Sequence, residues 1–441
     1  MRFRTMIALA LAAMSTHAQG PLSLSLHQAI ELAAKQSYAV QTSELEAEKA
    51  RRKINEVMAV GLPQVNADAG VQNYIDVPIS VVPNFFGGGS EGPEYLEAQF
   101  GLPWTTNARV QLNQLIFDGS YLIGLKATRE LRQQSEQELQ LSIRDAKAAA
   151  AKAYYGALAA DEGAVAMAEI VPVLERSLRE AEAMQQNGFM EETDADRIRI
   201  ELANTRDQLI VFERQRTLAM NFLRFYLGLP ASTPLELTDE LGTLIDDPVE
   251  RALVEQPLNL DSHVEHRIAA SRVRLQELNV RNEKAAYLPK LGGFFSYQQQ
   301  AFGVDNMIDT DWYPATLWGL SLEVPIFSSG MRSSKVAQAK LQQQQVDVNM
   351  VMTTERLRLE EAQDRSDAET AQALYETQKE RLALARKVFE RTTTKFTEGL
   401  SSSFELTNEQ SNYLQEQQAY IQRVADLVNA RTELRKTLDL F

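Results

Sequence analysis

The sequence has 441 residues, a formal net charge of −15 and no cysteine. This acidic balance argues against nucleic acid as a partner, because a phosphate backbone attracts basic surfaces. Without cysteine the chain forms no disulfide and offers no thiol for lipid attachment.

The first eighteen residues are predicted to be a secretory signal peptide, 1–18. Arg2 and Arg4 precede an apolar run from Met6 to Met14, and small residues near Ala18 fit a cleavage site. The apolar run is too short to span a bilayer as a helix. No later run reaches the eighteen apolar residues typical of a spanning helix. The sequence therefore predicts an exported chain without a transmembrane helix.

Four short motifs occur twice and in the same order. GLPQV (61–65) recurs as YLPKL (287–291), IFDGS (116–120) as IFSSG (326–330), NGFMEETD (187–194) as EGLSSSFE (398–405), and RFYLGLP (224–230) as RKTLDLF (435–441). Four pairs in order indicate duplication. We predict two repeats, 19–230 and 231–441, each composed of a helix, a β-hairpin, a long helix, a tight turn and a helix. The first repeat carries an insertion between Pro63 and Phe117, where the offset between paired motifs becomes smaller.

The two hairpins are predicted at about 64–117 and 290–327. Apolar residues there alternate with polar ones, most clearly in two runs: Val65, Ala67, Ala69 and Val71, and Trp318, Leu320, Leu322, Val324 and Ile326. A period of two predicts strands with one apolar and one polar face. Strands of roughly a dozen residues can cross a bilayer when tilted, and Trp312, Tyr313 and Trp318 would suit its interfaces. A soluble sandwich with an apolar core also fits the strands alone.

Two long segments, Ser120 to Asn187 and Gly330 to Glu398, are predicted to be helices. Each would be about 100 Å long at about 1.5 Å per residue. A heptad pattern typical of a coiled coil follows the second segment, at Leu406, Tyr413, Tyr420, Leu427 and Leu434. Gly188 and Gly399 stand where the chain must reverse, a position typical of left-handed helix caps. The chain is therefore predicted to form two antiparallel helical hairpins.

Four strands cannot close a transmembrane barrel, because closed barrels need at least about eight. Open strand edges are not tolerated in lipid. If these strands lie in a membrane, several copies of the chain must share one barrel, and the long helices must extend away from it.

The sequence resembles the TolC-type outer-membrane efflux family over nearly the whole mature chain. The resemblance is carried by the leucine-proline pair before each hairpin, the two strand-to-helix exits, and glycine turns with an acid six residues later. The exits contain Phe117, Gly119, Phe327 and Gly330; the turns run from Gly188 to Asp194 and from Gly399 to Glu405. The family implies an α+β membrane protein. Three copies would form a twelve-stranded β-barrel in the outer membrane, continuous with a helical barrel in the periplasm.

The resemblance implies a passive exit duct of a tripartite efflux or type I secretion system. Its expected partners are two further copies in a homotrimer, a periplasmic adaptor protein, an inner-membrane pump and outer-membrane lipid, with no cofactor and no nucleic acid. The alternative is an extracytoplasmic coiled-coil scaffold or adaptor without a barrel. An enzyme is disfavoured, because neither a phosphate-binding loop nor a nucleophile constellation is recognisable.

The resemblance also implies roles at the glycine turns. Gly188, Phe189, Gly399 and Leu400 match the adaptor-docking tip, and Thr193, Asp194, Asp196, Glu405 and Asn408 match the pore aperture. Phe396 and Ser401 occupy positions where some members carry a tyrosine-like hydroxyl and an arginine that lock the closed tip. A capping role is the alternative for these acids. Ser402 with Glu405 has capping-box spacing, and Thr193 with Asp196 is a near version.

The histidines give a weak metal signal. His263 and His266 are three residues apart, whereas zinc-protease helices use a spacing of four. No metal site is predicted, and these histidines are expected on a solvated helix surface.

Overall fold

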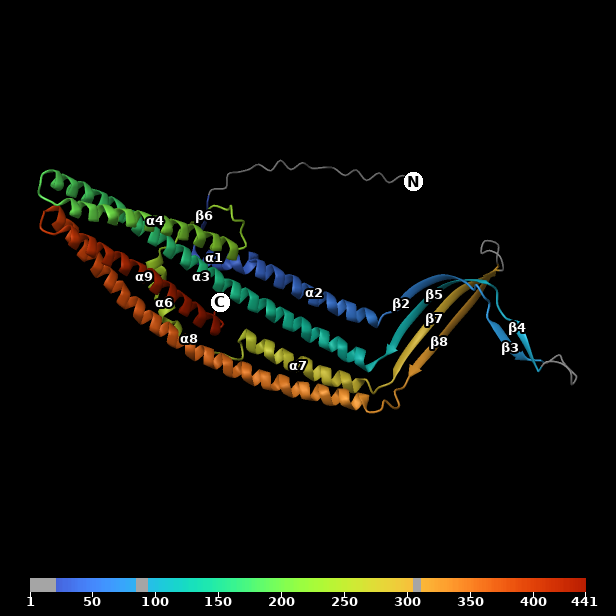
Figure 1. Ribbon diagram of the computed structural model, residues 1–441. Helices are drawn as coiled ribbons and strands as arrows, with labels where there is room; N and C mark the ends of the chain where they lie inside the picture. Colours follow the sequence, from blue (N-terminus) through green and yellow to red (C-terminus); the bar gives the residue numbers. More distant parts are fainter. Residues whose placement is uncertain (1–20, 85–93, 304–310) are drawn as a thin grey trace, which may run out of the picture. The chain divides into compact units, whose positions relative to one another are not determined.

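The computed structural model describes residues 21–84, 94–303 and 311–441 (Figure 1). The predicted signal peptide, 1–18, lies outside the described residues. The chain divides into two compact units. The first unit contains Met1–Glu46, Glu136–Ile268 and Val351–Phe441, and the second contains Ala47–Ser135 and Ala269–Met350. Each unit draws on both predicted repeats, and the repeat boundary after residue 230 stays a prediction.

The second unit contains a four-stranded sheet of order β2-β5-β7-β8, antiparallel throughout. Its strands are β2 (Gln64–Asn73), β5 (Trp104–Phe117), β7 (Lys290–Gly303) and β8 (Trp312–Glu323). The two predicted hairpins are therefore confirmed, and the pairing of β5 with β7 joins them. Strands β2 and β8 are the edges, and each leaves one side without a partner strand among the described residues.

The register confirms the two faces predicted from the alternation. One row runs Val65, Leu112, Phe295 and Trp318 across the four strands. This apolar face also carries Ala67, Val110, Tyr297, Leu320 and Leu322. The opposite face is polar, with Asp68 opposite Arg109 and Arg109 opposite Gln298. A cross-strand ion pair of 3.0 Å joins Arg109 Nε to Asp68 Oδ1 on that face.

Two features of the strands differ from expectation. Strand β8 ends at Glu323, so the predicted continuation of the hairpin to residue 327 is wrong. Pro325 explains the early end, because proline has no N–H to donate to a ladder. The predicted insertion in the first repeat contains a separate hairpin that the sequence did not indicate, formed by β3 (Ile79–Pro83) and β4 (Tyr95–Gln99).

The two strand-to-helix exits have similar sequences but different conformations. Helix α3 (Gly119–Gln186) begins at once after β5, and Asp118 Oδ1 accepts a hydrogen bond from Ser120 N at 2.7 Å. A Cβ on Gly119 would lie 2.7 Å from the Leu288 side chain, so glycine permits close packing there. In the second repeat Gly330 has φ +82° and forms a turn before helix α8 (Met331–Thr397). Both long helices end within one residue of their predicted limits.

The first unit contains two long helical hairpins, the C-terminal part of α3 with α4 (Glu192–Tyr226), and that of α8 with α9 (Ser403–Thr437). All five heptad positions predicted on α9 are buried, which confirms the coiled-coil pattern. A matching heptad on α8 was not predicted: Ala368, Tyr375, Leu382, Phe389 and Phe396. The two heptads face each other, and the rings of Phe389 and Tyr413 stack with centroids 5.7 Å apart.

Short elements that were not predicted pack against α3 and α9. Strand β1 (Leu22–Leu24) pairs in parallel with β6 (Leu235–Leu237), and the short helices α5 (Leu241–Ile245), α6 (Pro248–Arg251) and η1 (Ala252–Glu255) follow. The described residues also form helices α1 (Leu26–Gln36), α2 (Tyr38–Val60) and α7 (Val264–Ala285). The hydroxyl of Tyr154 on α3 lies 2.9 Å from both the carbonyl of Leu24 and a carboxylate oxygen of Asp239.

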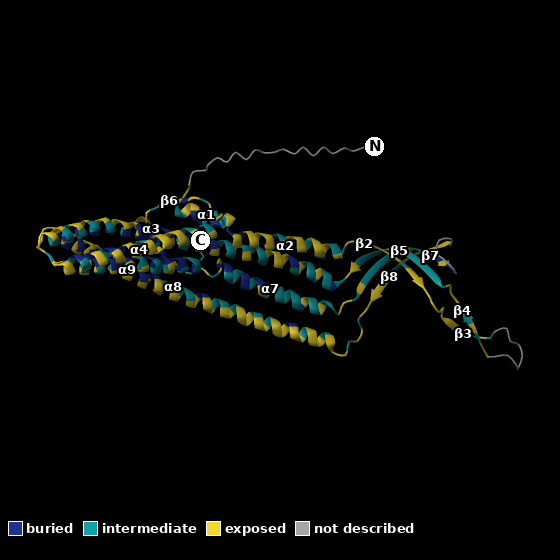
Figure 2. Cartoon of the chain, turned by 45° about the horizontal axis from the view of Figure 1, so that its top comes forward, coloured by how far each residue is buried: buried dark blue, intermediate teal, exposed yellow. Residues whose placement is uncertain are grey.

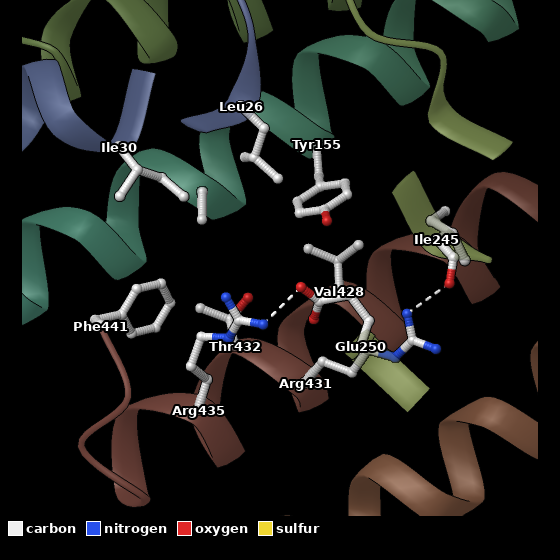
Figure 3. A pocket seen from close by; sticks show the side chains of 11 residues that line it. Leu26, Ile30, Tyr155, Ile245, Glu250, Val428, Arg431, Thr432, Arg435 and Phe441 are labelled. Atoms are coloured by element: carbon white, nitrogen blue, oxygen red, sulfur yellow. Dashed lines mark hydrogen bonds and ion pairs between the residues drawn. The ribbon is translucent and has the colours of Figure 1, made fainter. Parts of the chain in front are cut away.

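The last turns of α9 are tied to these short elements around a small cavity of about 20 Å³ (Figure 3). Arg431 donates to the carbonyl of Ile245 at 2.7 Å, and Arg435 donates to Glu250 at 2.6 Å. Because the guanidinium of Arg431 is buried, the carbonyl replaces hydrogen bonds that it would make to water. Within the described residues, no helix is both long enough and apolar enough to cross a bilayer.

Candidate functional site

The two helical hairpins reverse at the tip turns, residues 187–191 and 398–402. Gly188 has φ +77° and Gly399 has φ +71°, which confirms the predicted left-handed caps. Both turns close in the same way: Phe189 N donates to Met184 O at 2.9 Å and Leu400 N donates to Lys395 O at 2.8 Å. This pattern satisfies carbonyls at the helix end that would otherwise lack a partner.

Large apolar side chains project from the tip turns. Phe189 is 85% exposed and Leu400 is 73% exposed, and Figure 2 shows the turns in the colour of exposed residues. Phe404, in the first turn of α9, is also exposed, with the guanidinium carbon of Arg197 5.7 Å from its ring centre. Exposed apolar groups gathered at one end mark a candidate contact surface for another protein.

Ser402 is confirmed as a helix cap, whereas the near version of the capping box predicted at Thr193 is wrong. Ser402 is the N-cap of α9, and its Oγ accepts a hydrogen bond from Glu405 N at 3.2 Å. The carboxylate of Glu405 does not complete the box but accepts from Ser401 Oγ at 2.6 Å. Helix α4 instead begins after Glu191, and Thr193 lies inside its first turn, donating to the Glu191 carboxylate at 3.3 Å.

The predicted aperture acids have different surroundings. Asp194 is half-buried and accepts a hydrogen bond from Ser403 Oγ at 2.5 Å, which joins the two hairpins. Asp196 is paired with Arg199 at 2.5 Å, and Arg199 also binds Glu182 at 2.9 Å. Ser403 was missed by the sequence analysis, because its partner lies in the other hairpin and no local spacing reveals it.

The remaining predicted tip residues differ in exposure. Glu405 and Asn408 are both exposed on α9, and Asn408 Nδ2 lies 3.4 Å from Glu409 Oε1. Phe396 is 1% exposed within the α8 heptad, so this position belongs to the coiled-coil core. Ser401 is occupied by its hydrogen bond to Glu405. Of the predicted acids within the described tip, Asp196 therefore has a basic partner, whereas Asp194 and Glu405 each accept a hydrogen bond from a serine.

The expectation for His263 was wrong. The side chain is fully buried at the start of α7, because Asp439, Arg144 and Glu265 surround it. Burial lowers the pKa of His263, so the neutral imidazole is favoured. Arg144 is buried with it, donating to Glu265 at 2.9 Å and lying 3.6 Å from Asp439. Among the described residues, no group of three or more His, Cys, Asp or Glu side chains suits a metal ion.

The aromatic residues at the start of β8 lie on both faces of the sheet. Trp312 and Trp318 belong to the apolar face, whereas Tyr313 belongs to the polar face because neighbouring strand residues point in opposite directions. Tyr313 contacts Phe302 there, with ring centres 6.1 Å apart. An interfacial belt on the apolar face therefore suits the two tryptophans and does not suit Tyr313.

The long helical hairpins and the sheet with two open edges define a class of protein, a protomer of a channel that closes only between copies. The family of outer membrane efflux proteins matches residues 29–229 and 263–439 of the chain. The chain belongs to this family, whose members form trimeric channels in tripartite pumps. It is an outer-membrane efflux channel with a periplasmic helical part and not an enzyme, so the alternative of a scaffold without a barrel is wrong.

Solved structures share the fold at low sequence identity. CusC, described in terms of folding and transmembrane channel formation, is 15% identical with a TM-score of 0.68, covering 94% of this chain and 91% of CusC. The outer membrane channel CmeC of Campylobacter jejuni is 14% identical with a TM-score of 0.67, covering 94% of this chain and 85% of CmeC. A membrane protein from Pseudomonas aeruginosa is 16% identical with a TM-score of 0.69, covering 94% and 93%. No curated protein matches the sequence.

Proposed function

We propose that three copies of this chain pool their strands into one barrel and serve as the passive exit duct of a tripartite efflux or type I secretion system. The observation that carries this proposal is the sheet with two open edges and one apolar face. Unpaired backbone groups are too costly in lipid to remain at an edge. Pairing β2 of one copy with β8 of the next satisfies both edges, and three copies supply twelve strands.

The tip turns are the proposed docking site of a periplasmic adaptor protein, which an inner-membrane pump accompanies. Support comes from the exposure of Phe189 and Leu400 beside the backbone turns at Gly188 and Gly399. Apolar knobs on rigid turns suit the grooves of a helical partner, because little side-chain freedom is lost on binding. Replacing Phe189 and Leu400 by serine should abolish adaptor binding and leave the channel assembled.

The bond between Asp194 and Ser403 is the proposed contact that holds the two hairpins together in the resting tip. It supports a closed state because it joins α4 to α9 near the end of the helices, where the coiled-coil core ends. Adaptor docking that separates these helices would break the bond.

The mass of the protein in detergent tests the assembly. We expect a trimer with three chains per particle, measured by light scattering corrected for bound detergent. A folded monomer with intact helical and strand signals would contradict the shared barrel. Because one face of the strands is apolar, we also expect the trimer to fractionate with the outer membrane.

A further inference from the structure

The β3–β4 hairpin is separate from the four-stranded sheet. It lies in the connection between Asn73, where β2 ends, and Trp104, where β5 begins. The corresponding connection between β7 and β8 is short, from Gly303 to Trp312. The hairpin therefore belongs to the first repeat. It leaves the sheet at the end where β2 stops and β5 starts, which is the end opposite the connections to the helices.

One face of this hairpin exposes three large apolar side chains. Ile79, Val81 and Tyr95 are each more than half exposed there, and the face also carries Glu97 opposite Val81 and Gln99 opposite Ile79. The other face holds Val82 and Leu96, which are partly buried. An isolated two-stranded hairpin is marginally stable in water, and uncovered apolar side chains add to its instability. A partner that covers Ile79, Val81 and Tyr95 would therefore stabilise the hairpin.

Charge favours a protein partner over the membrane surface. The segment 74–103 contains neither lysine nor arginine. It contains four acids: Asp76, Glu91, Glu94 and Glu97. Phosphate-bearing lipid headgroups would repel such a segment, since recognition of anionic lipid depends on clustered basic residues. A protein surface that offers apolar contacts is the better match.

The place of the hairpin in the sheet selects the partner. The hairpin follows β2, and the order β2-β5-β7-β8 puts β2 and β8 at opposite edges of one copy. In the proposed barrel the free edge of β2 pairs with β8 of the next copy. The start of that β8 then lies beside the hairpin, because the end of β2 and the start of β8 are at the same end of the sheet.

The start of β8 presents an aromatic pair on the polar face. Tyr313 is 56% exposed and Phe302 is 38% exposed, and they contact each other. On the face that would line the barrel interior, lipid cannot cover them. The β3–β4 hairpin of the same copy leaves both rings exposed. This is expected, because that hairpin is attached to β2 at the opposite edge of the sheet. They are therefore an uncovered apolar patch within reach of a neighbour's hairpin.

We propose that Ile79, Val81 and Tyr95 of the β3–β4 hairpin pack on Phe302 and Tyr313 of the neighbouring copy. Three such contacts would clasp the edges between copies and narrow the outer mouth of the barrel. This inference rests on the proposed trimer, from which it is experimentally separable. It predicts contacts in one direction around the ring, from β3–β4 of each copy to β7–β8 of the next.

Disulfide crosslinking tests the contact. The chain has no cysteine of its own, so introduced pairs report alone. Tyr313→Cys is combined in turn with Ile79→Cys, Val81→Cys and Tyr95→Cys, and trimers in outer-membrane vesicles are oxidised. At least one combination should give a ladder of covalent dimers and trimers, because disulfide formation needs Cβ atoms about 3.5–4.5 Å apart. The matched control is Val82→Cys with Tyr313→Cys, on the opposite hairpin face, and it should give none.

Mixed trimers show whether the bond joins different copies. One tagged chain carries Val81→Cys and a second, differently tagged chain carries Tyr313→Cys, so only a bond between copies joins the tags. A bond confined to one chain, or no bond from any of the three hairpin positions in an intact trimer, overturns the clasp while leaving the channel function intact. Loss of the trimer itself in the parent chain would overturn the proposed function instead.

A fluorophore at Val81 provides a second measurement independent of disulfide geometry. Quenching by nitroxide-labelled lipid should be weak in the parent and rise severalfold when Phe302 and Tyr313 are replaced by serine. Strong quenching in the parent would place the hairpin face against lipid and contradict the clasp.

Discussion

Asp194 and Ser403 meet at the tip although they come from different hairpins. A hydrogen bond to a charged group contributes about 1.5–3 kcal/mol, so this contact is strong enough to bias the tip toward its closed arrangement. Ser403→Ala should raise the resting conductance of single channels in planar bilayers. The control is Ser401→Ala, which removes a bond within one segment only. Equal conductance of Ser403→Ala and the parent would contradict the gating role.

Glu265 gives a pH prediction. Burial alone would raise its pKa, but hydrogen bonds from Arg356 at 2.6 Å and Arg144 at 2.9 Å outweigh burial and hold the pKa below its usual range near 4.5. A depressed carboxyl pKa contributes stability that is present above about pH 4.5 and is lost as the pH falls through the folded-state pKa. Glu265→Gln should cost about 1.5–3 kcal/mol near pH 7 and flatten the acid loss.

Thermal melting followed by circular dichroism, repeated at several pH values, measures both effects of Glu265→Gln. Glu360→Gln is the matched control, because Glu360 also binds Arg356 but is 41% exposed, and surface pairs contribute about 0–1 kcal/mol. An acid loss as steep in Glu265→Gln as in the parent would show that this carboxylate does not carry the pH dependence.

Residues were predictable from sequence where their partners are local. The cap at Ser402 depends on the amide of Glu405 three residues later, and spacing alone reveals it. His263 was wrongly expected at the surface, because its burial depends on Arg144 and Asp439, which only the tertiary fold brings to it. The capping position predicted at Thr193 was wrong for a different reason. The N-cap of α4 is Glu191, two residues before the position that the spacing indicated.

The strand faces are the clearest property at the scale of elements. Leu320 lies on the apolar face opposite Gly293, and Ser321 lies on the polar face opposite Gly292. Arginine facing lipid near the bilayer centre costs roughly 2–4 kcal/mol, whereas the barrel interior is wet. Leu320→Arg should therefore reduce the amount of assembled outer-membrane protein several times more than Ser321→Arg. Quantitative blotting of fractionated membranes measures this, and equal losses would contradict the assigned faces.

The ends of helices and strands were predicted most accurately where the periodic pattern of the sequence was strongest. The long helices were predicted within a residue because a sustained pattern fixes both ends, with glycine at the turns. The heptad on α8 was overlooked although Phe396 and Phe389 belong to it, since alanine at position 368 weakens the pattern. The β3–β4 hairpin gave no alternation strong enough to separate it from a long connection.

At the scale of the whole molecule, most of the predicted architecture follows from the duplication of the sequence. Gly228 and Asp439 end α4 and α9 at matching positions of the two repeats, both with positive φ. Gly228 is closely packed, as a Cβ there would lie 2.0 Å from the carbonyl oxygen of Gln36. Asp439 instead accepts a hydrogen bond from Val264 N at 3.1 Å. The repeats share their architecture and differ in the contacts at each junction, which the sequence could not assign.

The charge of the assembled mouth gives the last prediction. Three copies would place three Glu405 carboxylates around the tip, whereas Asp196 is neutralised by Arg199 in each copy. Acids in a confined ring raise the local concentration of cations, and low-dielectric walls strengthen this effect. Glu405→Gln should therefore weaken cation preference, and Asp196→Asn should change it little.

Reversal potentials across a planar bilayer under a salt gradient measure this preference. The difference between Glu405→Gln and the parent should shrink in high salt, because the Debye length falls from about 10 Å at 0.1 M to about 3 Å at 1 M. Helix stability should barely change, since the capping bond of Ser402 uses the backbone amide of residue 405, which glutamine retains. Unchanged selectivity with a lowered melting temperature would assign Glu405 to the helix start alone. Changed selectivity with unchanged melting would place its carboxylate at the pore.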